Sequence, residues 1–276
     1  MRYYIGMIKS FSDKETRNTG LARFDRLLAV AGSVPEDDRT LVIVAPTWRT
    51  GLTGAIDPVT QKRVVDAAYW TSDYHANWIG LLRSDAVAAA VERRGWRLGF
   101  MPHPNMQPIL PQLDLPSYVE PLSFEGTDVQ GLYARCALLV TDYSSVAFNL
   151  AYLDRPVVYF QFDRDEMMRG GHMGRQGYFD YQRDGFGPVV DDLAGAERAV
   201  VAAIAGGPQP APPYRARIEA TFPVRDGRCC ERIVAAVEEL SRPWAGLPAG
   251  ALEAALEQQA SDEAAAEGGE LGPDGP

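Results

Sequence analysis

Short apolar runs alternate along most of the chain with segments whose apolar residues recur every three or four positions. The short runs are rich in β-branched residues and have the length of buried strands. They are Leu41–Pro46, Trp96–Met101, Ala137–Thr141, Pro156–Phe160 and Gly185–Val190, with a further short candidate at Pro116–Val119. Because these runs are apolar on both faces, they predict strands of a parallel sheet that is covered on each side.

The segments between these runs predict helices that cover such a sheet. Ser84 and Asp128 stand where helix N-caps are expected, and Pro58 stands at a first helical position. The predicted helices are Leu21–Ala31, Asp57–Ala68, Ser84–Arg94, Asp128–Cys136, Ser144–Leu153, Asp192–Ala205 and Asp226–Leu240. The alternation of strands and helices indicates an α/β protein with a Rossmann-like parallel sheet flanked by helices.

Composition divides the 276 residues into three parts. Residues 1–20 are a polar lead-in segment, residues 21–243 are the Rossmann-like domain, and residues 244–276 are an acidic tail that we expect to be disordered. The tail holds seven acidic and no basic residues from Ala249 onward, so the remainder carries only about −3 of the net charge of −10. The overall acidity therefore says little about the partners of the domain.

Several classes of protein do not fit this sequence. It has no basic block, so we expect no nucleic-acid partner. The cysteines Cys136, Cys229 and Cys230 lack a metal-ligand spacing, which favours a reducing compartment. No secretory signal or membrane-spanning run is apparent, so a cytoplasmic location is expected.

The most distinctive stretch is LLVTDYSSVAFNL, in which Asp142, Ser144 and Ser145 follow a predicted buried strand. Ligands of open parallel sheets bind outside the carboxyl ends of the strands, and backbone N–H groups at a helix start attract phosphate. Ser144 and Ser145 would add hydroxyl donors, while Asp142 would cap the turn or hold a hydroxyl of the ligand. The alternative is that Ser144 only caps the helix.

Two further strand ends carry polar groups on the same expected edge of the sheet. Arg49 offers a planar fork for phosphate oxygens, Thr47 offers a hydroxyl, and Trp48 could stack on a base. His103 can exchange a proton near neutral pH, and Asn105 follows it. Each residue alone is commonly structural, but three strand ends suited to phosphate chemistry favour a shared site.

The remaining candidates are weaker. Asp163 belongs to the one D-x-D sequence, a candidate for a divalent metal, although it also reads as a turn and we expect no metal or other cofactor. His172 lies in a glycine-rich stretch that could face a ligand, whereas His75 reads as a packing residue. No P-loop and no G-x-S-x-G elbow occurs, which argues against an NTPase and an acyl-transfer serine.

Four blocks resemble the CDP-glycerol glycerophosphotransferases, the teichoic-acid and capsule polymerases. They are APTWR, HP, LLVTDYSSVAFNLAYLDRPVVYFQFD and QGYFDYQRDGFGP, in that order, within a region of resemblance from about Thr19 to Leu240. The resemblance implies a GT-B architecture, of which this chain would be the donor-binding half. A further N-terminal half would then be a partner or a missing segment.

By that resemblance, His103 is catalytic and Arg49, Ser144 and Ser145 hold the diphosphate of the donor. Asp142 would face the nucleotide or the glycerol. The implied reaction moves glycerol phosphate from CDP-glycerol to a polyol-phosphate or glycan acceptor and releases CMP, at the inner face of the cell membrane. Two alternatives remain: a GT-B transferase with another nucleotide-activated donor, and a non-catalytic remnant of such an enzyme.

Overall fold

A computed structural model describes residues 17–58, 63–167, 179–241 and 258. Its centre is a six-stranded sheet in which every strand pair is parallel. In spatial order the strands are β5 (Val119–Pro121), β4 (Arg97–Phe100), β1 (Leu41–Val44), β6 (Cys136–Thr141), β7 (Val157–Phe160) and β8 (Val189–Val190). This confirms the predicted Rossmann-like parallel sheet. From β1 the chain adds β4 and β5 on one side and then β6, β7 and β8 on the other, so the topological switch point lies between β1 and β6.

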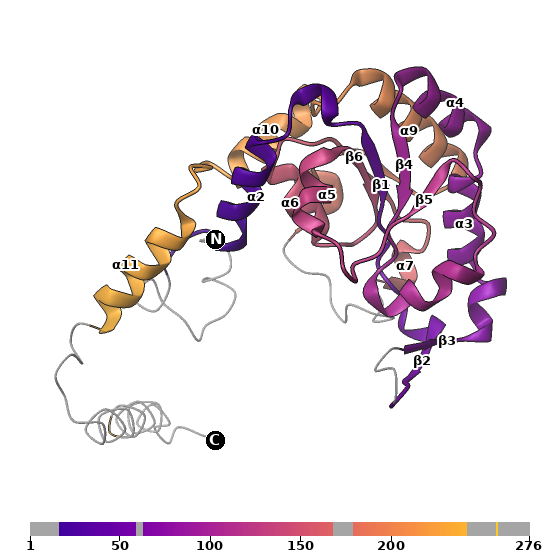
Figure 1. The fold of residues 1–276 in the computed structure, drawn as a ribbon, viewed down its shortest axis with the longest axis horizontal. Helices are drawn as coiled ribbons and strands as arrows, with labels where there is room; N and C mark the ends of the chain where they lie inside the picture. Colours follow the sequence, from indigo (N-terminus) through magenta and orange to yellow (C-terminus); the bar gives the residue numbers. More distant parts are fainter. Residues whose placement is uncertain (1–16, 59–62, 168–178, 242–257, 259–276) are drawn as a thin grey trace, which may run out of the picture. The chain divides into compact units, whose positions relative to one another are not determined.

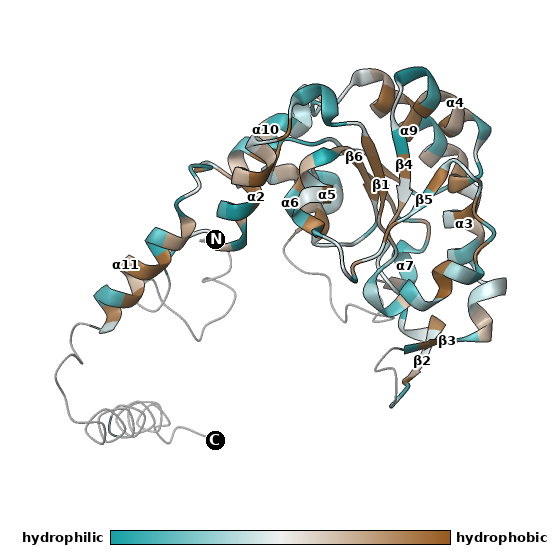
Figure 2. Cartoon of the chain, viewed as in Figure 1, coloured by the Kyte–Doolittle hydropathy of each residue, from teal (hydrophilic) through white to brown (hydrophobic). Residues whose placement is uncertain are grey.

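The strands are buried on both faces, as their continuous apolar character predicts. In β1, Leu41 and Ile43 enter one hydrophobic core while Val42 and Val44 enter the other, because successive side chains point to opposite faces. Figure 2 shows the resulting hydrophobic colour of the central strands. The sheet is therefore the middle of three layers, and only its edges are open to ligands.

Helices cover each face of the sheet (Figure 1). One core includes side chains of α2 (Arg23–Gly32), α5 (Val129–Arg135), α6 (Val146–Tyr152), α8 (Tyr181–Asp184) and α10 (Pro212–Thr221). The other core includes side chains of α3 (Asp73–Leu82), α4 (Asp85–Arg94) and α9 (Leu193–Gly206). The remaining elements are η1 (Glu36–Asp38), η2 (Thr50–Leu52), η3 (Ala67–Thr71), η4 (Pro104–Gln112), α7 (Arg164–Glu166) and α11 (Cys229–Ser241).

Helix ends follow the predicted capping chemistry in α4. The Ser84 hydroxyl accepts the Val87 N–H at 3.4 Å, and Gly95 ends the helix with φ of 67°. A left-handed conformation of this kind favours glycine, since other residues carry a Cβ that crowds the backbone. Asp128 also precedes its helix as predicted, but its side chain makes no capping hydrogen bond.

The predicted helix Asp57–Ala68 is wrong. Strands β2 (Thr53–Ile56) and β3 (Arg63–Val65) form an antiparallel pair there, and a 3₁₀ turn follows. Pro58 suits a turn as well as a first helical position, because its fixed φ serves both. The hairpin projects from the end of the sheet where the site lies (Figure 1).

Helix α10 was not predicted, since it begins within the stretch GGPQPAPP (206–213), whose glycines and prolines are typical of a linker. Pro212 occupies its first turn, where a missing N–H costs nothing. The chain divides into two compact units, Met1–Cys229 and Cys230–Pro276. The expected domain boundary at residue 243, and nearly all of the expected tail, lie outside the described residues.

Candidate functional site

Three chain segments leave the sheet at its carboxyl edge around the switch point. They follow β1, β6 and β7 in the chain, and hydrogen bonds join the first two. The Thr141 hydroxyl donates to the Ala45 carbonyl at 2.6 Å, and the Ala45 N–H donates to the Val140 carbonyl at 2.8 Å. These short contacts hold the loop after β1 beside the turn Asp142–Ser145, which we call the serine turn.

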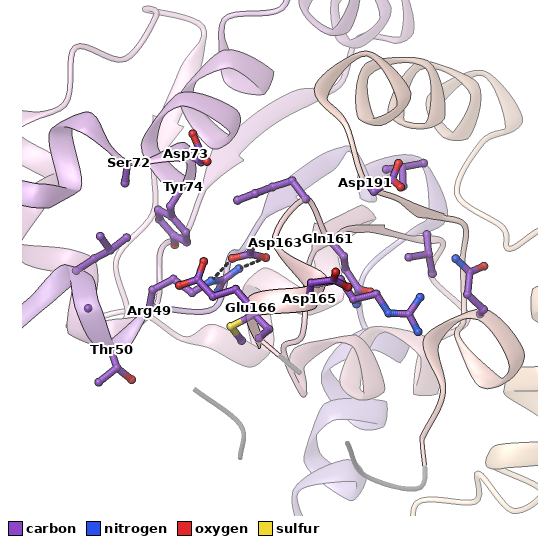
Figure 3. A pocket seen from close by; sticks show the side chains of 18 residues that line it. Arg49, Thr50, Ser72, Asp73, Tyr74, Gln161, Asp163, Asp165, Glu166 and Asp191 are labelled. Atoms are coloured by element: carbon purple, nitrogen blue, oxygen red, sulfur yellow. Dashed lines mark hydrogen bonds and ion pairs between the residues drawn. The ribbon is translucent and has the colours of Figure 1, made fainter. Parts of the chain in front are cut away.

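A buried ion-pair network lies under this edge. The Arg49 guanidinium donates from Nη2 to Asp142 Oδ2 at 2.9 Å and from Nε to Asp163 Oδ2 at 2.6 Å, as Figure 3 shows for Asp163. Its Nη1 donates to the Thr47 carbonyl at 2.7 Å. Arg49 is only 9% exposed, so both carboxylates serve to neutralise a charge that is largely out of water.

Two tyrosine rings flank the same guanidinium. The Arg49 Cζ lies 5.1 Å from the Tyr74 ring and 5.3 Å from the Tyr143 ring, within the range of cation–π attraction. Burial opposes the charged form of Arg49, but Asp142 and Asp163 outweigh it and raise its pKa above the usual range. Burial raises the pKa of Tyr143 and Tyr74 as well, so both phenols stay neutral around a permanent cation.

Asp142 connects the network to the loops above it. Its Oδ1 accepts the Thr47 N–H at 2.9 Å and the Tyr143 N–H at 2.6 Å, and its own carbonyl accepts from the Gln161 side chain at 3.0 Å. Its exposure is 0%. The side chain of Asp142 thus faces other protein groups, which favours a positioning role, and its expected contact with a ligand stays a prediction.

The expected contact of Arg49 with phosphate stays a prediction, and the present partners of its guanidinium oppose it. A guanidinium binds phosphate through a planar pair of N–H groups, and here those groups already point at carboxylates. Displacing them would leave Asp142 buried and unpaired, which is costly. The structure thus gives Arg49 the role of tying together the segments after β1, β6 and β7.

The two serines remain at the surface of the turn. Ser144 is half-buried, and its Oγ accepts the Val146 N–H at 3.2 Å, although Ser145 and not Ser144 is the N-cap residue of α6. A hydroxyl that accepts one hydrogen bond can still donate another. Ser145 is exposed and its side chain makes no capping bond to α6. Since α6 has only seven residues, its dipole would be a minor attraction for an anion, and the binding of phosphate by the two hydroxyls stays a prediction.

His103 is half-buried at the start of η4, after β4. Its Nδ1 accepts the Asn105 N–H at 3.2 Å, so the neutral ring carries its proton on Nε2. Its ring stacks on Trp48 with centroids 6.0 Å apart, which brings the loops after β1 and β4 into contact.

Two further candidates remain. Thr47 precedes Trp48 in the chain, and its Oγ1 is a buried hydroxyl without a hydrogen-bond partner. His172 lies outside the described residues.

Sequence reasoning missed several residues of this region. Arg63 of β3 places its Cζ 5.4 Å from the Trp48 ring, but the sequence assigned it to a helix that does not form. Tyr74 and Gln161 were also missed, because a lone aromatic in an uncertain segment and a lone amide after a strand carry no motif. Tyr74 comes to lie beside Arg49, and Gln161 beside Asp142, only in the tertiary fold.

A cavity of about 850 Å³ opens beyond Arg49, at the ends of β7 and β8 and the start of α3 (Figure 3). Arg49 and Asp163 line it, whereas the serine turn and His103 do not. Asp163 accepts hydrogen bonds from Arg49 and from the Tyr143 hydroxyl, the latter at 3.2 Å.

Over the described part of the chain, no group of three or more ligating side chains could hold a metal ion. No helix in that part is long and apolar enough to cross a membrane.

Known proteins share this fold and these blocks. The chain is 26% identical over 221 residues to the minor teichoic acid biosynthesis protein GgaB of Bacillus subtilis (strain 168), an alignment covering 80% of this chain and 23% of that protein. It is 40% identical over 157 residues to the teichoic acid poly(glycerol phosphate) polymerase of the same strain, covering 55% and 18%. The chain thus spans less than a quarter of either relative.

A solved structure and a family model extend the comparison. The wall teichoic acid polymerase TagF aligns with a TM-score of 0.56 at 19% identity, over 88% of this chain and 57% of that one, which supports the fold. The family model described as CDP-Glycerol:Poly(glycerophosphate) glycerophosphotransferase matches residues 12–239. That span includes every strand of the sheet and the loops after β1, β4, β6 and β7. The chain therefore belongs to the CDP-glycerol:poly(glycerophosphate) glycerophosphotransferase family.

Proposed function

We propose that this chain is the donor-binding half of a transferase that moves glycerol phosphate from CDP-glycerol to a hydroxyl of a growing polymer and releases CMP. The observation that carries the proposal is that the loop after β1 contacts both the serine turn, through Thr47 and Asp142, and the loop after β4, through Trp48 and His103, within a family-model match that spans all three. A TagF variant soaked with CDPG is among the structures that share the fold, at 19% identity and a TM-score of 0.52.

The chemistry asks for positioning and charge stabilisation. The acceptor oxygen attacks the phosphorus that bears glycerol, the bond from that phosphorus to the CMP oxygen breaks, and the acceptor proton is lost to a base or to solvent. Ser144 and Ser145 would donate hydrogen bonds to the diphosphate. Catalysis of this kind depends on holding the reacting atoms in line, which rigid strand ends favour.

His103 would act on the phosphate oxygens through Nε2. With Nδ1 accepting the Asn105 N–H, a neutral ring presents Nε2–H as a donor, and a protonated ring adds a positive charge. Either form stabilises negative charge that builds on the transferred group or on departing CMP. Trp48 would keep the ring oriented by stacking.

The proposed roles of the buried residues are structural. Arg49, Asp142 and Asp163 would hold the three loops in register without touching the donor. Thr47 and Asn105 would add a hydroxyl and an amide beside them, and His172 is retained only as a candidate from its glycine-rich surroundings. We propose no metal ion at Asp163, since its carboxylate is committed to Arg49.

The acceptor and the cellular setting are also proposals. The family resemblance favours a polyol-phosphate or glycan acceptor at the inner face of the membrane, with a second, N-terminal half completing the cleft. Because the chain covers 57% of the TagF chain, we propose that full activity requires that half. A transferase with another nucleotide-activated donor, and a remnant that binds nothing, are the competing functions.

Calorimetric titration separates these functions. We expect CDP-glycerol and CMP to bind the chain more tightly than the uridine analogues do. The double change Ser144→Ala and Ser145→Ala should weaken CDP-glycerol by about tenfold or more, because each lost hydrogen bond to a charged group is worth about 1.5–3 kcal/mol. Ser123→Ala and Ser117→Ala, which change serines elsewhere in the chain, form the matched control.

Each competing function has its own signature in that experiment. A clear uridine preference would replace CDP-glycerol with another donor. Binding that the serine double variant leaves unchanged would remove the serine turn from the site, and no nucleotide binding at all would favour the remnant.

A further inference from the structure

The cavity beyond Arg49 has a chemistry opposite to that of the serine turn. It is bounded by the start of α3, the segment after β7 and the end of β8, and the side chains around it are drawn in Figure 3. A volume of about 850 Å³ is within the range of small-molecule sites. The proposed reaction does not account for it, because none of the residues assigned to the donor phosphates lines it.

Two buried polar groups line the cavity without partners. Gln161 is 1% exposed and gives its amide N–H to the Asp142 carbonyl, while its Oε1 accepts nothing. Tyr74 is 4% exposed, and its hydroxyl has no hydrogen-bond partner either. Buried polar atoms are almost always paired, so these two unpaired atoms, which lie just behind the surface of the cavity, favour a ligand that would donate and accept hydrogen bonds once the two side chains turn toward it.

Carboxylates dominate the rim. Asp73, Asp165, Glu166 and Asp191 line the cavity and are exposed. The positive charge of Arg49 does not offset them, because Asp142 and Asp163 already neutralise it.

The second cation of the lining, Arg164, also faces a carboxylate, at 3.8 Å from Asp180. The rim would therefore repel a phosphate. The described residues offer no metal-holding group either.

We propose that this cavity binds a neutral polyol, namely the hydroxyl-bearing end of the acceptor. Hydroxyl groups donate well to carboxylates and to an amide oxygen, and they can accept from a phenol. The rings of Tyr74 and Phe162 offer apolar surface for the carbon skeleton. This proposal rests on the proposed transferase function and deepens it, since it gives the donor-binding half a share of acceptor recognition.

The shared wall explains how the two ligands would meet. Arg49 and Asp163 belong both to the network beneath the serine turn and to the lining of the cavity. An anionic donor held at the turn and an uncharged hydroxyl held in the cavity would lie on either side of one rigid ion pair. The acidic rim would repel the donor phosphates and accept the uncharged polyol end of the acceptor, so each ligand would bind at its own site.

Ligand-observed NMR with glycerol and sorbitol as probes tests this inference. We expect both to bind the wild-type chain, and the double change Glu166→Gln and Asp191→Asn to weaken them by about tenfold, as loss of hydrogen bonds to charged groups predicts. These carboxylates are exposed, so the fold should persist. Asp37→Asn with Asp114→Asn removes two carboxylates elsewhere and should change nothing.

Three results would overturn the inference: unchanged polyol binding in the double variant, tighter binding of ethanolamine than of glycerol, or tighter binding of glycerol 3-phosphate than of glycerol. The second would make the cavity a cation site and the third an anion site. CMP titration of the same samples keeps the two proposals apart. If the wild-type chain binds CMP but neither polyol, only the cavity proposal is removed, whereas absent CMP binding by the wild-type chain removes the donor function.

Discussion

Replacing Arg49 with methionine should lower the free energy of unfolding by about 3–5 kcal/mol, because it leaves a buried, uncompensated carboxylate. Asp142 has 0% exposure and loses its 2.9 Å partner, and Asp163 loses two hydrogen bonds. Methionine preserves much of the side-chain volume, so the loss reports charge and hydrogen bonding rather than a cavity. Urea denaturation followed by circular dichroism measures it.

Two companion variants make the result specific to the network. Arg83→Met breaks an ion pair with Asp114 whose partners are largely exposed, and it should change stability little. Adding Asp142→Asn to Arg49→Met removes the stranded charge and should recover part of the loss, which a double-mutant cycle quantifies. A loss of less than about 1 kcal/mol for Arg49→Met would contradict the positioning role.

Replacing His103 with asparagine should reduce CMP release from CDP-glycerol by about 10²- to 10³-fold, the usual cost of removing one group that stabilises negative charge developing in the transition state. An asparagine amide oxygen can still accept the Asn105 N–H that Nδ1 accepts at 3.2 Å, so the turn should persist. Donor affinity should change much less than the rate. The measurement is CMP release by the chain, assayed together with the proposed N-terminal half and a polymer acceptor.

His75→Asn is the matched control for that experiment. His75 lies on α3 among Tyr69 and Trp70, with ring centroids 5.0 and 5.4 Å away, and burial lowers its pKa. Neither of these two rings belongs to a loop of the proposed site. The rate of CMP release by His75→Asn should therefore stay within about threefold of wild type, a change of less than about 1 kcal/mol in the activation free energy. Equal rates for wild type and His103→Asn would exclude a catalytic role for His103.

The sequence was sufficient for the sheet and for the placement of the loops. Runs such as Leu138–Val140 are apolar at every position, which only a strand buried on both faces requires, and the order of strands and helices then predicts a shared carboxyl edge. The failure at Asp57–Ala68 has a local cause. An aspartate followed by proline begins helices and turns alike, and only the pairing of Thr53 with Val65 decides between them.

The role of Arg49 could not be read from sequence. Its two carboxylate partners lie 93 and 114 residues further along the chain, and each also appeared to be a candidate ligand group. An arginine and two aspartates that each follow a strand are predicted to lie near one another. The pattern does not predict which of these side chains face the ligand. Burial decides that question, since a carboxylate without solvent must be paired before any ligand arrives.

A crystal structure of the chain with CDP-glycerol tests the central claim most directly. We predict that the diphosphate lies within hydrogen-bond distance of Ser144, Ser145 and the His103 Nε2, while Arg49 keeps both of its carboxylate partners. A diphosphate bound to a guanidinium of Arg49 that has left Asp142, or a nucleotide seated in the acidic cavity, would contradict it.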